Sequence, residues 1–283
     1  ARAVCAHLDI PFYVANYEDE FRASVIDNFV ENYAAGRTPN PCVQCNMHVK
    51  FTPPLSRPRA LGCSRLATGH YARIEAGADG VLRLGRARDR GKDQSYFLFN
   101  MPADALGHVL FPLGGMKKEA VRSLAKKYDL PVAKKKDSQG ICFLGSVSIT
   151  DFLRTEVGLS EGSVKDASGR ELGTHDGAIA YTIGERVNVK NGPAGPWYVI
   201  RKDLASNTLT VSHDFRAAPI AGKDIYFSEA NILSSPPSIV SVQYRYHGPV
   251  ADGTLSLDDG AFRPRHALGE PLADMLGYVE LFV

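Results

Sequence analysis

The pattern of apolar residues changes at about Gly145, and this change most limits the folds open to the chain. Before it, segments with a helical repeat alternate with strand-like segments. After it, the apolar runs are short, β-like and separated by many glycines. Helices alternating with strands indicate an α/β domain, whereas many short strands indicate a small barrel or sandwich. We therefore predict an α/β domain over residues 1–145, a small mostly β central connector domain over 146–212 and a C-terminal β-barrel domain over 213–283.

The N-terminal part of the α/β domain contains one clear helical repeat. Apolar residues recur every four positions from Phe21 to Tyr33. This spacing predicts an amphipathic helix from Tyr17 to Ala35, ended by Gly36. The residues in front of it, "ARAVCAHLDIPF", resemble a strand and a turn that belong inside a larger domain. Because they also open without a methionine, we expect sequence upstream of them.

Further elements are predicted on both sides of the change at Gly145. "SRLATGHYARI" is typical of a buried strand that runs out into a loop at Gly69-His70, and "YARIEAGADGVLRLGRA" of a hairpin with its turn at Asp79-Gly80. "KKEAVRSLAKKYDLP" predicts a helix that stops before Pro131. Later in the chain, Ile149 to Val157 predicts a short helix, and "WYVI" and "TLTVS" predict a hairpin around Asp203 to Asn207.

Composition favours a soluble globular protein. Of the 283 residues, 44% are hydrophobic and 23% are charged, no apolar run approaches the length of a membrane span, and the first residues lack the pattern of a signal peptide. Five cysteines are an odd number in a chain too large to need disulfide staples. That number fits a reducing compartment. We therefore expect a cytoplasmic protein with no membrane partner.

Charge is spread unevenly along the chain. Residues 1–145 contain 21 Lys and Arg against 14 Asp and Glu, whereas the remainder contains 12 against 17. Basic residues are densest from Arg57 to Lys92, and Lys134 to Lys136 form a second cluster. A basic half suggests a polyanionic partner, but a solvated basic face has the same composition. Charge alone leaves both interpretations open.

The segment "TPNPCVQCN", Thr38 to Asn46, combines two prolines with a Cys-x-x-Cys and has three interpretations. In the first, Cys42, Cys45 and His48 are spaced like zinc ligands, and Cys142 or Cys63 completes the four. A single Cys-x-x-Cys is a weak zinc signal, however. In the second, the cysteines are small core hydrophobes, which suits Cys5 and Cys63 better than the pair beside the prolines.

The third interpretation is thiol chemistry. His48 and Lys50 follow Cys45, and three lysines precede Cys142 within eight residues. Since nearby cations lower the pKa of a thiol, this pattern predicts two activated cysteines on loops that meet in space. We expect Pro39 and Pro41 to stiffen the loop that presents Cys45. The residues alone favour thiol chemistry slightly over zinc binding.

Six segments stand in one order along the chain: "GRTPNPCVQCNMHVKF", "LATGHYAR", "KDQSYFLF", "KKKDSQGICFLG", "THDGAIAYTIGERVNV" and "GPWYVIRKD". Together they closely resemble the bacterial tRNA-specific 2-thiouridylases, which replace the uracil O2 of the wobble uridine in tRNA with sulfur. The resemblance runs from Ala1 to about Tyr246. It implies that the α/β domain is an adenine-nucleotide alpha-hydrolase-like (PP-loop) domain. It also implies a sulfurtransferase.

The resemblance assigns a reaction to two of the cysteines. ATP, used with Mg²⁺, would adenylate uracil O2 and make it a leaving group. Cys142 would carry a persulfide, and Cys45 would attack that carrier, leaving a Cys45–Cys142 disulfide. A sulfur-carrier protein or a cysteine desulfurase would supply the sulfur, and no bound metal cluster is expected. Thiols of low pKa are what such exchange requires.

The resemblance also implies binding residues and a partner, the anticodon stem-loop of tRNA. An Arg-Tyr pair suits RNA because it offers a phosphate contact and a stacking face, whereas a lone histidine could equally be a packing residue. The implied contacts are Asn40, Pro41 and Cys42 to the target base, Gly69 to ATP, and His70, Lys92, Asp93, Gln94, Arg245 and Tyr246 to tRNA.

Three departures from the family pattern stand out. The family begins with a Gly/Ser-rich loop that binds the ATP phosphates, and no such segment occurs here. We therefore expect it upstream, and do not expect residues 1–283 alone to adenylate uracil. Cys42 occupies a position that is aspartate in many members. The last forty residues fit the family only loosely.

Two other functions remain as alternatives. A different PP-loop ATP pyrophosphatase would activate another carbonyl without sulfur transfer, and would not need the cysteine segments. A zinc-stabilised RNA-binding module would use the basic half and "CVQC". About one zinc per chain, lost on Cys45→Ser, would favour that module.

Overall fold

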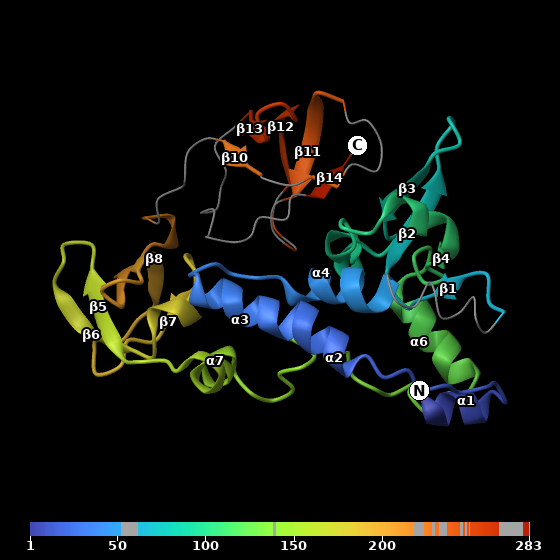
Figure 1. Ribbon diagram of the computed structural model, residues 1–283, viewed down its shortest axis with the longest axis horizontal. Helices are drawn as coiled ribbons and strands as arrows, with labels where there is room; N and C mark the ends of the chain where they lie inside the picture. Colours follow the sequence, from blue (N-terminus) through green and yellow to red (C-terminus); the bar gives the residue numbers. More distant parts are fainter. Residues whose placement is uncertain are drawn as a thin grey trace. The chain divides into compact units, whose positions relative to one another are not determined.

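Figure 1 shows the computed structural model, which describes residues 1–51, 62–137, 140–217, 224–227, 230–231, 237–243, 246, 248, 250–265 and 280–282. The chain divides into two compact units. Unit 1 comprises Ala1–Val25, Cys42–Cys142 and Asn231–Ser234, and unit 2 comprises Ile26–Pro41, Phe143–Ala230 and Ser235–Val283.

Helices are concentrated in the first 157 residues, and short 3-10 and π segments extend or connect them. The α-helices are α1 (Arg2–His7), α2 (Glu18–Phe21), α3 (Asp27–Ala34), α4 (Pro41–Cys45), α6 (Lys118–Lys127) and α7 (Ile149–Val157). The π and 3-10 segments are η1 (Arg22–Ile26), η2 (Asn46–Phe51), η3 (Arg90–Lys92), η4 (Ser95–Phe97), η5 (Ala103–His108), η6 (Ala178–Ala180) and η7 (Phe215–Ala217).

The predicted helix from Tyr17 to Ala35 is confirmed as the continuous run α2–η1–α3. It buries Val25, Phe29 and Tyr33, which belong to the four-residue repeat seen in the sequence. The run ends at Gly36, whose φ of 76° is a left-handed conformation that glycine adopts without strain. The helix predicted before Pro131 is confirmed as α6.

The prediction of a strand and turn at the start of the chain is wrong, because residues Arg2–His7 form the helix α1. Three of its six residues are alanine or arginine, which are among the best helix formers. None of its residues is buried, so local propensity outweighs the apolar pattern. His7 Nε2 lies 3.0 Å from the carbonyl oxygen of Tyr128.

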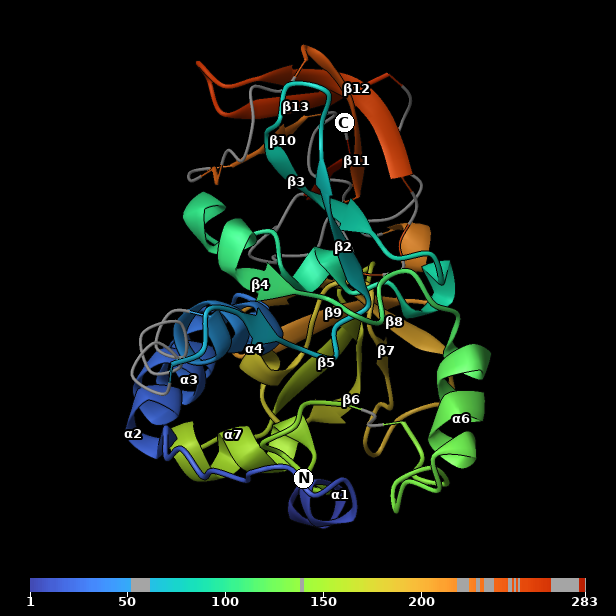
Figure 2. The same ribbon diagram turned by 90° about the vertical axis from the view of Figure 1, so that its right-hand side faces the viewer.

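Unit 1 contains two small two-stranded sheets. β1 (Leu66–Ala67) pairs in parallel with β4 (Val109–Leu110), and β2 (Ala72–Ala76) pairs with β3 (Leu82–Arg86) as the predicted antiparallel hairpin (Figure 2). β1 is shorter and more exposed than the buried strand predicted around it. The core of this unit contains Phe51, Leu98 and Met101, each no more than 2% exposed. Burial of such side chains stabilises a fold by about 1.5–3 kcal/mol each.

Unit 2 contains two five-stranded sheets. The first has the order β6-β5-β9-β8-β7, with β5 and β9 parallel and the other pairs antiparallel. The second has the order β10-β13-β12-β11-β14 and is antiparallel throughout. The strands of the first sheet are β5 (Gly162–Asp166), β6 (Glu171–His175), β7 (Arg186–Val187), β8 (Trp197–Asp203) and β9 (Thr208–Ser212), and those of the second are β10 (Ile225–Tyr226), β11 (Ile239–Gln243), β12 (Val250–Ser256), β13 (Ala261–Pro264) and β14 (Glu280–Phe282).

The predicted short helix and hairpin of unit 2 are both confirmed. α7 begins after Ser148, whose Oγ accepts a hydrogen bond from the backbone N–H of Asp151 at 3.0 Å, and it ends at the left-handed Gly158. The β8–β9 pair is the hairpin predicted around Asp203 to Asn207. Its inner face packs Trp197, Val199 and their neighbours into a separate core.

Candidate active site

Cys42 and Cys45 lie on the short helix α4, which continues directly into the π segment η2. The prediction that Pro39 and Pro41 hold Cys45 on a stiff loop is therefore wrong. Pro41 is the first helical residue, where its fixed φ suits the helix and its missing N–H would have had no partner. The helix places Cys42 and Cys45 three residues apart, on one face.

Cys142 belongs to the same compact unit as this pair. Burial raises the pKa of both Cys42 and Cys45, and the charge of Cys142 adds to that rise at both sulfurs. All three are thiols. They differ in access to solvent, since Cys45 is 8% exposed, Cys42 is half-buried and Cys142 is exposed.

The prediction of a thiol with a lowered pKa is wrong for Cys45, and the pKa of Cys42 is raised as well. Burial is the main cause that raises both pKa values, because it disfavours the thiolate. Lys50 opposes this effect at both sulfurs, as the sequence suggested. It follows Cys45 by five residues, and a π segment brings residues at that spacing to neighbouring turns. Cys45 is therefore a protonated thiol at neutral pH and must lose its proton to react.

Asp137, five residues before Cys142, forms ion pairs with three cations. It pairs with Lys92 at 2.9 Å, Lys118 at 3.1 Å and Arg122 at 3.0 Å. Hydrogen bonds from Lys92 and Lys118 lower its pKa to about 2, so it remains charged at any pH at which the protein works. Asp137 thus ties the segment that leads to Cys142 to α6 and to the turn at Lys92.

Because of these ion pairs, we expect Asp137 to hold the segment that leads to Cys142 in position. Asp137→Asn removes the charge that holds the three cations, and we expect it to weaken formation of a Cys45–Cys142 disulfide several-fold by loosening the segment. Titration in mixtures of reduced and oxidised dithiothreitol measures this. Asp129→Asn, at an exposed aspartate with a left-handed φ of 49° that asparagine tolerates, is the matched control. Equal disulfide stability in both variants would contradict the role given to Asp137.

Asp93 and Gln94 brace the turn in which they lie. Asp93 is 5% exposed, and its carboxylate accepts hydrogen bonds from Ala87 N at 2.6 Å, Ser95 Oγ at 2.8 Å and Arg86 Nε at 3.1 Å. Gln94 exchanges two hydrogen bonds with the backbone of Tyr71, one through its side-chain Oε1 at 3.1 Å and one through its own N–H at 2.8 Å. Of the predicted tRNA-contacting turn, Lys92 is the residue that presents a cation, and it pairs with Asp137.

His70 lies in an apolar setting next to the end of β1. Its ring centroid is 5.8 Å from that of Phe51 and 6.0 Å from that of Phe111, and its Nδ1 lies 2.8 Å from Thr68 Oγ1. Burial, aided by the charge of Lys50, lowers the pKa of His70 to about 4. The imidazole is therefore neutral at pH 7.

The lowered pKa of His70 makes unit 1 sensitive to acid. Because the folded value lies below the ordinary 6.5, the neutral ring contributes its full stability above about pH 6.5. That contribution is lost as the pH falls toward 4, and it amounts to as much as about 3 kcal/mol. Urea unfolding at several pH values should therefore show that the free energy of unfolding falls more steeply between pH 6.5 and 4 for the wild type than for His70→Gln. Parallel curves would refute this assignment.

Gly69 precedes His70 in the loop after β1. A Cβ added at Gly69 would meet only Leu113 Cδ1, at 4.0 Å, so the backbone here is open to a ligand. β1 and β4 are parallel, and ligands of open α/β sheets bind beyond the carboxyl ends of such strands. The contact of Gly69 to ATP stays a prediction, which this open backbone allows.

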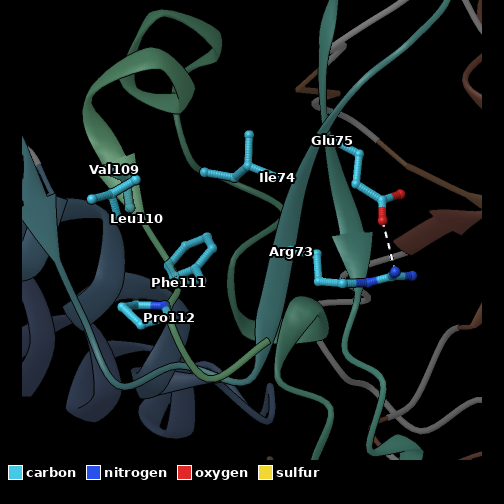
Figure 3. Close-up of a pocket in the computed structure, with 7 residues that line it drawn as sticks. All are labelled: Arg73, Ile74, Glu75, Val109, Leu110, Phe111 and Pro112. Carbon is cyan, nitrogen blue, oxygen red and sulfur yellow. Dashed lines mark ion pairs between the residues drawn. The ribbon is translucent and has the colours of Figure 1, made fainter. Parts of the chain in front are cut away.

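A pocket of about 450 Å³ lies in unit 1 (Figure 3). Its walls are the β2 residues Arg73–Glu75 and the segment from Val109 to Pro112. Arg73 and Glu75 form an ion pair at 2.7 Å at its rim. None of the predicted site residues lines the pocket, although Phe111 also packs against His70.

The remaining predicted contacts lie in unit 2 or outside the described residues. Asn40 is half-buried and Pro41 is buried at the start of α4. Tyr246 is 41% exposed. Arg245 lies outside the described residues, so the structure describes only Tyr246 of the predicted Arg-Tyr pair.

Among the described residues, no group of three His, Cys, Asp or Glu side chains is arranged to hold a metal ion. In the same part of the chain, no helix has both the length and the apolar character needed to cross a membrane.

The sequence did not single out Asn46 or Asp137 as part of the site. Asn46 is 3% exposed and donates from Nδ2 to the carbonyl of Phe97 at 2.8 Å. Its Oδ1 is buried and accepts no hydrogen bond from the described residues. A buried acceptor in this state is costly, by about 1–3 kcal/mol, and is available to a donor on a ligand. The position of Asn46 directly after Cys45 is the sequence feature that could have pointed to it.

Comparison with known protein families assigns two parts of the chain to described domains. A family model described as the tRNA methyl transferase HUP domain matches residues 1–146, and one described as the tRNA methyl transferase PRC-barrel domain matches residues 150–213. The chain therefore combines a HUP (PP-loop) domain with a PRC-barrel domain, which confirms the predicted fold class.

Whole-chain relatives identify the family within that class. The chain is 48% identical over 272 residues to the tRNA-specific 2-thiouridylase MnmA of Geotalea uraniireducens, covering 92% of this chain and 70% of the relative. It is 43% identical over 251 residues to that of Geobacter metallireducens (87% and 68%), and 44% identical over 283 residues to that of Beutenbergia cavernae (96% and 74%). This chain belongs to the tRNA-specific 2-thiouridylase family, which is a family of sulfurtransferases. The predicted resemblance is thus confirmed.

Proposed function

We propose that this protein is a tRNA-uridine 2-sulfurtransferase that thiolates the wobble uridine, and that Cys142 and Cys45 perform the sulfur transfer. The observation that carries the proposal is the gathering of Cys42, Cys45 and Cys142 in one unit, with Cys142 exposed and Cys45 buried. An exposed carrier can be reached by a donor protein, whereas a buried attacking thiol is shielded from solvent reductants.

In the proposed reaction, ATP first adenylates uracil O2 and pyrophosphate leaves, so that the oxygen can later leave with AMP. The terminal sulfur of the Cys142 persulfide then bonds to uracil C2 and displaces AMP. The Cys45 thiol loses its proton, its sulfur attacks Cys142 Sγ and the bond from Cys142 to the transferred sulfur breaks. The products are 2-thiouridine, AMP, pyrophosphate and a Cys45–Cys142 disulfide.

The HUP domain supports the use of ATP, and the open backbone at Gly69 beyond the carboxyl end of β1 supports a nucleotide contact there. Mg²⁺ bound with ATP would neutralise phosphate charge. Lys50 lowers the pKa of the Cys45 thiol against the effect of burial, and so helps the proton to leave. Its proposed role is to activate this thiol.

We assign the anticodon stem-loop of tRNA as the polyanionic partner. Asn40, Pro41 and Cys42 are proposed to contact the target base at the start of α4. Lys92, Arg245 and Tyr246 are proposed to contact tRNA directly, whereas the hydrogen bonds of Asp93 and Gln94 and the packing of His70 favour a supporting role for those three.

The sulfur donor is proposed to be a sulfur-carrier protein or a cysteine desulfurase that loads the exposed Cys142. Thiols that must be reduced after each turnover suit a cytoplasmic enzyme. Incubation of the full-length protein with ATP, a persulfide donor and tRNA tests the function. Nucleoside mass spectrometry should show 2-thiouridine at the wobble position only when ATP is present. ATP-independent or absent thiolation would refute the proposal.

A further inference from the structure

Two of the six ordered motifs, "THDGAIAYTIGERVNV" and "GPWYVIRKD", have no part in the reaction above. The structure describes both within unit 2, which also contains the segment Ile26–Pro41. That segment leads from α3 to α4, the helix that begins at Pro41 and bears the two cysteines of "CVQC". Contacts between the two motifs and this segment therefore bear on how the site is held.

The chain leaves α3 through a well-defined helix end. The backbone N–H of Gly36 donates to the carbonyl oxygen of Tyr33 at 2.8 Å, and that of Arg37 donates to the carbonyl oxygen of Asn32 at 2.8 Å. These two hydrogen bonds form a Schellman motif, which a left-handed glycine closes. The segment that follows thus starts from a fixed backbone position.

Lys202, in the second motif, holds this helix end from β8. Its Nζ donates to the carbonyl oxygen of Gly36 and, at 3.1 Å, to that of Tyr181. A cation at the C-terminal end of a helix is also favoured by the helix dipole. Leu204 follows in the same hairpin, and a Cβ added at Gly36 would collide with its Cδ1. The β8–β9 hairpin therefore both packs against the helix end and bonds to it.

Thr182, in the first motif, holds the segment two residues further on. Its Oγ1 lies 2.8 Å from Thr38 Oγ1, so the two hydroxyls share a hydrogen bond. Thr182 is itself fixed, because its N–H donates to Glu185 Oε2 at 2.9 Å and its carbonyl accepts from the Glu185 N–H at 3.0 Å. The N–H of Val199, in β8, donates to the Glu185 carbonyl at 2.9 Å. This turn is thus tied to the strand that carries Lys202.

We propose that Lys202 and Thr182 are positioning residues for the thiolation reaction, an inference that rests on the function proposed above. They hold the segment in front of α4 at two points, the second of which lies two and three residues before Asn40 and Pro41. Since one residue spans at most about 3.3–3.6 Å of chain, Asn40 and Pro41 have little room to shift. Contacts from the PRC-barrel part of the chain thus fix the residues proposed to receive the target base.

This role affects the rate of reaction more than the affinity for tRNA. A base that sulfur must attack reacts fastest in one orientation, and a small misplacement lowers the rate. Affinity for a nucleic acid comes mainly from contacts to its phosphates, which neither anchor makes in this role. Loss of an anchor should therefore slow thiolation at saturating tRNA and leave the dissociation constant nearly unchanged.

Matched substitutions in the full-length protein test the two anchors. Thr182→Val removes the hydroxyl with little change of shape, Thr182→Ser keeps the hydroxyl, and Lys202→Met removes the ammonium group and keeps a long side chain. Thr210→Val and Lys165→Met are the controls, because both residues are half-buried on strands of the same sheet. Amide hydrogen exchange over residues 37–45 and single-turnover thiolation at saturating tRNA are measured for each variant.

Thr182→Val and Lys202→Met should each speed amide exchange in this segment about fivefold and slow single-turnover thiolation about tenfold. The dissociation constant for tRNA should stay within about twofold of the wild-type value. Thr182→Ser should restore both rates, and the two controls should match the wild type. The double variant Thr38→Val/Thr182→Val should be no slower than either single variant, because all three lose the same hydrogen bond.

The outcomes separate this inference from the proposed function. If the wild type forms no 2-thiouridine, the proposed function is wrong. If the wild type is active, unchanged amide exchange in Thr182→Val and Lys202→Met shows that they are not anchors. Faster exchange with an unchanged thiolation rate, even with a lower melting temperature, shows a merely structural contact and overturns the positioning role. Thr182→Ser as slow as Thr182→Val overturns the role given to the hydroxyl.

Discussion

Cys45→Ser and Cys142→Ser are each expected to lower the rate of wobble-uridine 2-thiolation by at least about 10³-fold, because each removes a sulfur through which the transferred atom must pass. The dissociation constant for tRNA should change by less than about twofold, since neither thiol provides a cation for the phosphates. Single-turnover thiolation with mass-spectrometric detection measures the first quantity, and filter binding at fixed salt measures the second.

Cys63→Ser supplies the matched control for these two variants. Cys63 lies in the same unit and is exposed, as Cys142 is, but it has no part in the proposed reaction. Cys63→Ser therefore measures the effect of removing an exposed thiol that does not carry or attack sulfur. We expect it to retain wild-type activity. A comparable loss of tRNA binding in the Cys45 and Cys142 variants would refute the division between sulfur transfer and binding.

The largest effect on stability is expected at Asp93. Asp93→Ala removes the acceptor for the buried Ala87 N–H and for Ser95 and Arg86, so three donors lose their partner together. We expect the free energy of unfolding to fall by about 3 kcal/mol, because the substitution leaves buried donors unpaired and breaks a partly buried ion pair. The melting temperature should fall by about 5–10 °C.

Asp79→Ala is the control for Asp93. Asp79 pairs with Arg83 across the hairpin at 2.7 Å, but both side chains are exposed, and exposed ion pairs contribute little. Its melting temperature should stay within about 1 °C of the wild type. If Asp93→Ala melts at the wild-type temperature but loses tRNA binding, Asp93 contacts tRNA directly and its bracing role is minor.

Local sequence patterns were sufficient where one segment determines its own structure. α7 follows from a capping serine, an apolar repeat and a terminal glycine, all within ten or so residues of one another. The hairpins β2–β3 and β8–β9 follow from alternating residues around turn sequences. In the same way, the spacing of Cys42 and Cys45 together with six ordered motifs sufficed for the family.

The properties of the site depended on long-range contacts that no segment shows by itself. Nearby lysines suggested low thiol pKa values, but burial of α4 outweighs Lys50 and raises them. The ion pair between Lys92 and Asp137 joins residues 45 positions apart. α4 itself was missed because a proline was taken to stiffen a loop, although the first position of a helix accepts proline equally well.

A single turnover of the loaded enzyme shows whether Cys45 and Cys142 meet as a sulfur-transfer pair. The full-length protein is loaded with a persulfide, allowed a single turnover with ATP and tRNA, quenched with acid and mapped without reductant. Linked tryptic peptides 38–50 and 137–154, formed in proportion to 2-thiouridine, are predicted. Formation of 2-thiouridine while Cys45 remains a thiol, unlinked from Cys142, would contradict this pairing.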